Sequence, residues 1–248
     1  MNASDPGFHI PSTLELPDNE VQLWRLDLRA LAASEGRWLP LLSSDEQARA
    51  ARFIPQQARQ NFIVTRGVLR TVLAAYLATD PKRLTLQTSS KNKPSLGPPH
   101  DSHVCFNVAH SGDVALLAFV RRREVGVDVE QIRQNIEVEA IARRFFSPDE
   151  QKQLATVPPA DKVSAFFRCW TRKEAYVKAK GEGLWLPLDQ FDVCVASGSD
   201  NALLATRPDR SEAARWSLLE VAAGLGYVAA LCVAGRDFRV LGWDGTYC

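Results

Sequence analysis

Residues 125–130 have the sequence Val-Gly-Val-Asp-Val-Glu, and the fold can be inferred outward from them. Valine alternates with other residue types, which predicts a strand with one buried face, because successive side chains of a strand point to opposite sides of a sheet. The same alternation puts Gly126, Asp128 and Glu130 on the other face. Residues i and i+2 lie roughly 7 Å apart, so the two carboxylates can close around one hard cation such as Mg²⁺. The alternative is a solvated strand face with two ordinary acids.

The residues just before this strand predict an antiparallel hairpin. Apolar residues alternate at 104–108, a turn follows at 110–113, and residues 114–120 return as a buried strand. A second hairpin turn is predicted at 121–124 and leads into the acid-bearing strand. We therefore expect three consecutive strands.

Further upstream the sequence predicts a strand and two helices. Residues 21–28 have strand character, and Ser43 with Glu46 forms a capping box ahead of a short helix. Residues 57–78 have the periodicity of a longer amphipathic helix. The first half thus ends on a long helix followed by a hairpin.

The same order of elements returns downstream. Ser147 and Glu150 form another capping box, with proline at the first helical position, and a long helix is predicted from about 161 to 180, ending at Gly181. Three further strands are expected at residues 191–195, 216–221 and 227–233. Each half therefore combines a long helix with a hairpin, a weak internal duplication that predicts an α+β protein with two lobes joined near residues 121–124.

A stripe on the second long helix carries the strongest sign of chemistry. Trp170, Glu174 and Lys178 follow one another at i, i+4 and i+8, so they share one side of the helix. The plain alternative is a surface ion pair worth a few tenths of a kcal/mol. Trp170 and Val177 on the same side favour a stripe that faces inward.

Composition excludes several classes of protein. The 248 residues are 46% hydrophobic and 24% charged with a net charge of +1, which is typical of a globular protein and too balanced for bulk attraction to nucleic acid or an anionic membrane. No run of about 18 apolar residues is present, so we expect no membrane insertion. The five cysteines are odd in number, without a C-x-x-C pair, which predicts no disulfide framework and favours the reducing cytoplasm.

Other polar groups are weak candidates when taken alone. His110 ends a buried strand, residues 90–94 form a compact basic loop, and Arg49 belongs to a set of arginines on two helices. Each has an ordinary explanation as a satisfied surface group, a loop or a solvated arginine. Ser111 does not stand in the G-x-S-x-G context of a serine nucleophile.

Taken in this order, the motifs resemble the 4'-phosphopantetheinyl transferases of the long, two-lobed type. The resemblance is carried by Gly-Val-Asp-Val-Glu at 126–130, Trp-Thr-Arg-Lys-Glu-Ala-Tyr-Val-Lys at 170–178, and Phe-Asn-Val-Ala-His-Ser-Gly at 106–112. Residues 143–147 are similar to the family's segment that meets the carrier protein. The resemblance implies two similar α+β lobes related by a pseudo-twofold duplication, each with a long helix against an antiparallel sheet. We expect residues 1–123 to form the lobe that contacts the coenzyme A nucleotide, and residues 124–248 the lobe with the carboxylates and the catalytic helix.

The resemblance also implies the residues of the site. Asp128, Glu130 and Glu174 would ligate Mg²⁺, with Asp128 and Lys178 near the pyrophosphate of coenzyme A. The catalytic pair would be Glu174 and Lys178, with Glu174 or a metal-held water as the general base. The nucleotide end of coenzyme A would contact Arg49, Lys93, Asn107 and His110, of which Arg49 and His110 are the best candidates for the 3'-phosphate.

The implied reaction is Mg²⁺-dependent transfer of 4'-phosphopantetheine from coenzyme A to a serine of an apo acyl, peptidyl or aryl carrier protein, releasing 3',5'-ADP. A monomer is expected because two fused lobes enclose the cleft, with neither nucleic acid nor a membrane as partner. One alternative is a non-catalytic coenzyme A or carrier-protein binding module of the same fold. Another is a different Mg²⁺-dependent phosphoryl enzyme, which the lack of a Walker-type glycine loop disfavours.

Overall fold

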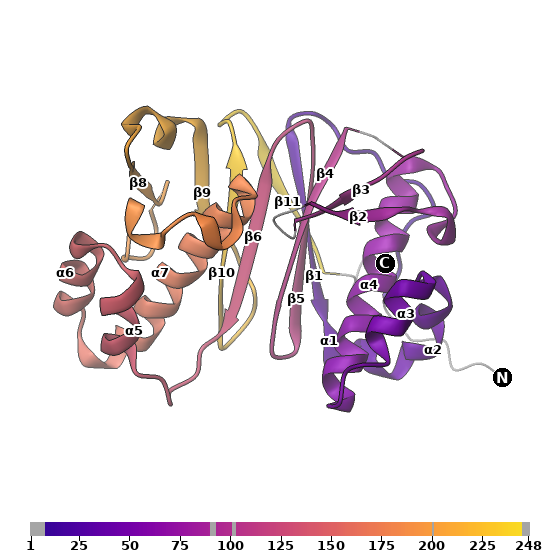
Figure 1. Cartoon of the computed structure of the whole chain (residues 1–248), viewed down its shortest axis with the longest axis horizontal. Helices are drawn as coiled ribbons and strands as arrows, with labels where there is room; N and C mark the ends of the chain where they lie inside the picture. The colour runs from indigo at the N-terminus through magenta and orange to yellow at the C-terminus, as the bar shows by residue number, and fades with distance from the viewer. Residues whose placement is uncertain (1–7, 90–92, 101–102, 200, 245–248) are drawn as a thin grey trace.

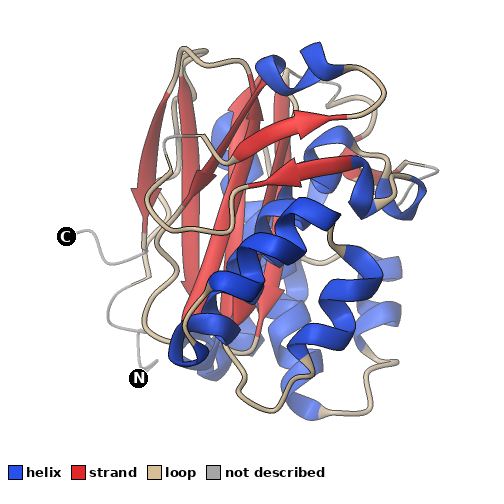
Figure 2. Ribbon diagram, turned by 90° about the vertical axis from the view of Figure 1, so that its left-hand side faces the viewer, coloured by secondary structure: helices blue, strands red, loops and turns tan. Residues whose placement is uncertain are grey.

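Four layers make up the molecule, in the order helix, sheet, sheet, helix (Figure 1). The computed structural model describes residues 8–89, 93–100, 103–199 and 201–244. One sheet has the strand order β11-β1-β5-β4 and the other β6-β10-β9. Figure 2, viewed from the side of the second lobe, shows helices covering the outer face of its sheet. None of the described helices is long and apolar enough to cross a membrane.

The first lobe contains short helices, one long helix and two hairpins. Its elements are β1 (Glu20–Asp27), α1 (Leu28–Leu31), α2 (Glu35–Trp38), α3 (Ser44–Ala50), α4 (Gln56–Leu77), β2 (Leu86–Thr88), β3 (Pro94–Leu96), β4 (Val104–Ser111) and β5 (Val114–Arg121). The second lobe contains β6 (Val125–Gln131), α5 (Val138–Phe145), α6 (Pro148–Thr156), α7 (Pro159–Lys180), β7 (Phe191–Val193), β8 (Leu203–Thr206), β9 (Trp216–Glu220) and β10 (Tyr227–Ala234), and β11 (Arg239–Trp243) follows. Both capping boxes and the glycine stop of α7, where Gly181 has φ +66°, are confirmed.

The two lobes repeat one topology. The order β1-β5-β4 in the first sheet matches β6-β10-β9 in the second, and each lobe has a 22-residue helix, α4 or α7. A small hairpin follows each long helix, β2-β3 in the first lobe and β7-β8 in the second. The prediction of an α+β fold with two similar lobes is confirmed.

One turn was wrongly predicted. Residues 121–124 do not close a hairpin, because β6 pairs with β10 in the other sheet. The physical reason is that β5 is already bonded along both edges, by β1 on one side and β4 on the other. The chain therefore passes from the first sheet to the second at this point, and the turn links the lobes.

The end of the described chain returns to the first sheet. Strand β11 pairs parallel with β1, with Arg239 opposite Glu20 and Trp243 opposite Trp24. The rings of Trp24 and Trp243 stack at 4.8 Å between centroids. We propose to keep the division of the chain into lobes 1–123 and 124–248, with β11 as a strand that the second half contributes to the sheet of the first.

Three apolar clusters hold the layers together. One lies between α4 and the first sheet, and one between α7 and the second sheet. The third joins the two sheets and contains the three valines of β6. The buried face predicted for β6 thus packs against the other sheet, and its second face turns to α7.

Candidate active site

A cleft of about 640 Å³ lies between the two lobes. The first lobe lines it from β3 and β4, and the second lobe lines it from α5, α7 and the segment after α7. The lining residues are Lys93, Pro94, Asn107, Val108, Arg144, Phe145, Glu174, Val177, Lys178, Gly181, Gly183, Leu186, Pro187, Leu188 and Asp189. The cleft therefore joins predicted coenzyme A contacts with the predicted catalytic pair.

Gly126 lets strand β6 and helix α7 come into direct contact. A Cβ atom at this position would lie 2.2 Å from the carbonyl oxygen of Ala175 and 2.3 Å from the backbone nitrogen of Ala179. No side chain fits such a gap, so the strand can approach the helix this closely only with glycine there. Asp128 is two residues along the same face, which brings it to the helix that carries Glu174 and Lys178.

Asp128 is the most deeply buried acid of the site. The residue is only 6% exposed, and its Oδ1 accepts a hydrogen bond of 2.6 Å from the ammonium of Lys178. Burial raises the pKa of Asp128 to about 7, Lys178 opposes this shift, and Glu174 and Glu130 add to it. Its Oδ2 is buried and has no hydrogen-bond partner among the described residues.

The other two carboxylates, Glu174 and Glu130, interact electrostatically with Asp128. Burial raises the pKa of Glu174, Glu130 raises it further, and Lys178 lowers it. Glu130 Oε2 accepts a hydrogen bond of 2.8 Å from the hydroxyl of Ser111, which lies on β4 of the first lobe. The structure thus brings the three predicted acids into one electrostatically coupled group.

These acids have the right chemistry for a hard cation. Within the described ranges no three Asp, Glu, His or Cys side chains stand in the arrangement of a metal site, and the Lys178 ammonium lies at Asp128. The buried, unbonded Oδ2 of Asp128 is nevertheless an oxygen that lacks a positive partner. Because Mg²⁺ prefers carboxylate oxygens, the residues fit this ion.

Only two of the four predicted nucleotide contacts line the cleft. Lys93 and Asn107 line the cleft, and Lys93 donates from Nζ to the carbonyl of Ala179 at the end of α7 at 2.9 Å. His110 is the last residue but one of β4, and partial desolvation of its ring and the charge of Lys178 lower its pKa, against the opposing effect of Glu130. Arg49 does not line the cleft.

Arg49 lines a second cavity, of about 550 Å³, on helix α3. Its guanidinium lies 5.3 Å from the ring centroid of Phe62, and Arg52 and Phe53 line the same cavity. Residues 90–92, the rest of the predicted basic loop, lie outside the described residues. The structure therefore does not unite Arg49 with the other predicted contacts.

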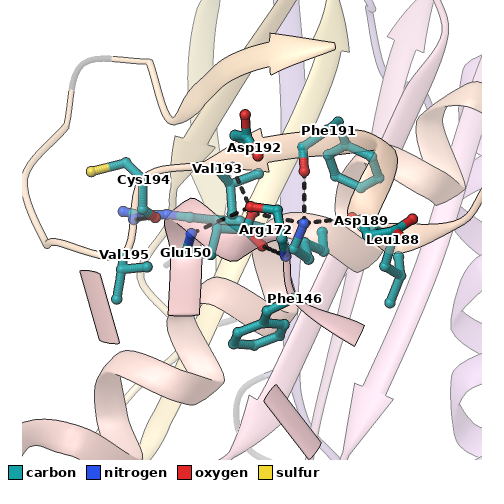
Figure 3. A network of polar contacts seen from close by, with 12 residues as sticks. Phe146, Glu150, Arg172, Leu188, Asp189, Phe191, Asp192, Val193, Cys194 and Val195 are labelled. Carbon is teal, nitrogen blue, oxygen red and sulfur yellow. Dashed lines mark hydrogen bonds and ion pairs between the residues drawn. The ribbon is translucent and has the colours of Figure 1, made fainter. Parts of the chain in front are cut away.

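A buried ion pair between α7 and α6 was missed. Lys173, the residue before Glu174, is fully buried, and its Nζ lies 2.7 Å from Glu150 Oε1. The ammonium also donates to the carbonyls of Leu188 and Phe191. Glu150 is drawn with these loop residues in Figure 3, where it also accepts from the backbone nitrogen of Val193. The capping-box motif identified Glu150 in the sequence, but no local pattern indicates that Lys173 turns away from solvent.

An exposed tryptophan beside the cleft, Trp185, was also missed. Trp185 is 80% exposed, and it lies between Gly183 and Leu186, which line the cleft. On α5, the ring of Phe145, which lines the cleft, packs edge-on against Trp170 of α7 at 5.7 Å between centroids. Phe145 belongs to residues 143–147, the segment that is similar to the family's carrier-protein contact, so this expected contact lies beside the cleft.

Known proteins resemble both lobes of this chain. A family described as the 4'-phosphopantetheinyl transferase superfamily matches residues 124–232, and one described as 4'-phosphopantetheinyl transferase, N-terminal, matches residues 33–121. The chain is 37% identical over 235 residues to 4'-phosphopantetheinyl transferase HetI of Nostoc sp., covering 94% of this chain and 95% of that one. It is 29% identical over 211 residues to 4'-phosphopantetheinyl transferase Sfp of Bacillus subtilis, covering 85% and 90%. A solved apo-ACPS structure from Chronobacterium ammoiniagenes aligns with 46% of this chain and 98% of its own, with 18% identity and a TM-score of 0.32.

Proposed function

The chain belongs to the 4'-phosphopantetheinyl transferase superfamily, and from this premise we propose that it transfers 4'-phosphopantetheine from coenzyme A to a serine of an apo acyl, peptidyl or aryl carrier protein. The observation that carries the proposal is the coupled group of Asp128, Glu130, Glu174 and Lys178, two members of which line the cleft between the lobes. The family assignment makes the chain a transferase, and these residues supply the chemistry that such a transfer needs.

Asp128, Glu130 and Glu174 would hold Mg²⁺. When bound, this ion neutralises charge on the pyrophosphate of coenzyme A. The buried Oδ2 of Asp128 supports this assignment, because a carboxylate oxygen without a partner is costly unless a cation meets it. Lys178 supplies a second positive charge at the same place, and its hydrogen bond to Asp128 keeps its ammonium at the acid group.

Glu174 would act as the general base. The serine oxygen forms a bond to the β-phosphorus of coenzyme A, the bond from that phosphorus to the bridging oxygen breaks, and 3',5'-ADP leaves with that oxygen. Glu174 accepts the serine proton, and burial raises its pKa toward the range in which a base works near neutral pH. Lys178 donates toward the pyrophosphate and stabilises the charge of the leaving group.

The first lobe would bind the nucleotide end of coenzyme A. Lys93 lines the cleft, and the pKa of His110 responds to the charges of Lys178 and Glu130, which supports contacts of both residues with a bound anion. Arg49 remains a candidate for the 3'-phosphate from its separate cavity. Because both lobes of one chain line the cleft, we propose that the protein works as a monomer.

The test is intact-mass analysis of an apo carrier protein incubated with this protein, coenzyme A and Mg²⁺. We expect a gain of one phosphopantetheine, lost with EDTA and slowed about 100-fold or more in Glu174→Gln. Asp161→Asn, which changes an exposed acid of the same helix, is the matched control and should transfer normally. Coenzyme A binding without transfer to any of several carriers would favour the non-catalytic binding module instead.

A further inference from the structure

The two sheets meet at strands β4 and β6. Each is an edge strand of its own sheet, and the two lie side by side. Among the described strands, neither is bonded through its backbone to the other. Side chains of β4 make the connection instead, which leaves the sheets separate while fixing one to the other.

Two residues of β4 supply these bonds. Asn107 Oδ1 accepts a hydrogen bond of 2.9 Å from the backbone nitrogen of Val127, and Ser111 Oγ accepts one of 3.1 Å from that of Gln131. The two donors are four residues apart on β6, and the two acceptors are four residues apart on β4. The side chains therefore act as spacers between two strands that run alongside one another.

The bonded positions enclose the acid pair. Val127 directly precedes Asp128, and Gln131 directly follows Glu130. Ser111 has a second role, because its hydroxyl also donates to Glu130 Oε2 at 2.8 Å. The first lobe thus holds both the backbone of the acid-bearing strand and one of its carboxylates.

We propose that Asn107 and Ser111 are positioning residues that hold β6 so that Asp128 and Glu130 face the cation together. This inference rests on the proposed function. It gives Asn107 a different role from the coenzyme A contact expected from the sequence, because Asn107 is buried and its side-chain oxygen is already bonded to β6. Groups that orient metal ligands typically affect metal affinity 10–100-fold, so the effect should be measurable.

The first experiment measures Mn²⁺ binding by the intact protein with coenzyme A, from the free-ion EPR signal. Ser111→Ala should weaken Mn²⁺ binding about 10-fold or more, and Ser111→Thr, which keeps the hydroxyl, should restore it to within about threefold. The matched control is Ser217→Ala, which removes a buried hydroxyl bonded to the carbonyl of Gly235, away from the acids. That control should leave Mn²⁺ affinity unchanged. Wild-type affinity in Ser111→Ala, or an equal loss in Ser217→Ala, would overturn the proposal.

The second experiment separates positioning from coenzyme A contact. Asn107→Ala should lower kcat about 10-fold with little change in the KM for coenzyme A, whereas loss of a substrate contact would raise KM. Asn201→Ala is the matched control, because Asn201 Oδ1 accepts from the backbone nitrogen of Leu218 on β9, at 3.0 Å. It should leave both constants unchanged. A raised KM at constant kcat in Asn107→Ala would overturn the proposal.

The two proposals fail in different ways. A wild-type protein that modifies no carrier protein would contradict the transferase assignment, while the Mn²⁺ measurement would still decide whether Ser111 orients the acids. A wild-type protein that transfers normally, together with a Ser111→Ala variant that binds Mn²⁺ equally well, would overturn the positioning role alone.

Discussion

In each lobe, a cation on the long helix forms an ion pair with the glutamate of a capping box. The cation is an arginine in the first lobe and a lysine in the second. In the first lobe Arg70, the fifteenth residue of α4, bonds to Glu46 of the capping box at 2.7 Å and to the carbonyls of Pro81 and Leu84. In the second lobe Lys173, the fifteenth residue of α7, meets Glu150 of the other capping box, also at 2.7 Å. Both cations hold the loop that follows the helix.

The surroundings of these ion pairs differ. Glu46 is 13% exposed, whereas Glu150 and Lys173 are both fully buried, and burial raises the pKa of Glu150. Lys173 of the buried pair directly precedes Glu174, which lines the cleft. The ion pair of the long helix is therefore more deeply buried in the second lobe, which carries the acids, than in the first.

The lobes differ most where the chemistry lies. Val114 and Tyr227 begin equivalent strands and pair with Asp27 and Gln131, which aligns β1 with β6. On this alignment, and with the long helices aligned from their first residues, every acid or lysine of the site has an uncharged counterpart in the first lobe. The counterparts of Asp128, Glu130, Glu174 and Lys178 are Trp24, Leu26, Thr71 and Ala75. A repeated scaffold therefore carries the acid group in one copy alone.

The closeness of strand and helix also differs between the copies. In the first lobe, Tyr76 on α4 donates a hydrogen bond of 2.6 Å to Gln22 on β1. The equivalent positions in the second lobe are Ala179 and Gly126, which are in direct contact. Large polar side chains keep the first pair apart, and small residues bring the second pair together at the site.

The largest expected effect on stability comes from breaking the buried ion pair between Lys173 and Glu150. Lys173→Met leaves Glu150 buried without its cation, so the free energy of unfolding should fall by about 3–5 kcal/mol. Arg70→Met should cost about 1–2 kcal/mol less, because Glu46 reaches solvent. Urea unfolding of both variants measures the difference, and adding Glu150→Gln to Lys173→Met should recover part of the loss. An equal or larger loss of unfolding free energy in Arg70→Met would contradict the expected difference between the two ion pairs.

A middle-sized effect is expected at the close approach. Gly126→Ala pushes α7 away from β6, because its Cβ meets backbone atoms that cannot rotate aside, and such overpacking costs about 1–3 kcal/mol. Transfer activity should fall with it, since the separation between Asp128 and the helix changes. Gly36→Ala, at a position with nothing within 4 Å, is the control in both assays. Unaltered unfolding and activity in Gly126→Ala would contradict the role of this contact.

The smallest expected effect is a pH dependence of the free energy of unfolding, which should come from Asp128 in the second lobe. In metal-free protein the pKa of Asp128 is about 7, above the value of about 4 for an unfolded aspartate, so folding takes up a proton between these values. The contribution of Asp128 to stability is therefore complete below about pH 4 and is lost as the pH rises through 7. The decline between pH 6 and 8 should be about 1 kcal/mol, and Asp128→Asn should lack it.

Urea unfolding in EDTA at pH 6 and 8 measures this difference. The control is Asp27→Asn, an acid at the end of β1 that caps α1 in the first lobe. The Asp27→Asn variant should show the same change in unfolding free energy between pH 6 and 8 as the wild-type protein. An equal change in Asp128→Asn and the wild-type protein would show that another group is responsible.

Much of the framework could be predicted because its signals are local. Alternation marked the strand at 125–130, helical spacing put Glu174 and Lys178 on one stripe, and the two capping boxes marked the starts of α3 and α6. Each of these patterns is written within a few residues, where periodicity and cap chemistry act. The order of such elements sufficed to predict two similar lobes.

Tertiary structure decided which sequence-distant groups meet. It alone placed β6 in the second sheet and β11 in the first, since strand partners are chosen by free edges and buried faces and not by neighbours along the chain. It also buried Lys173 against Glu150, left Asp128 Oδ2 without a partner among the described residues, and set Arg49 apart from the cleft. The sequence determined the residue types and local elements of the acid group, and packing of β6 against α7 and β4 decided its burial, its charges and its geometry.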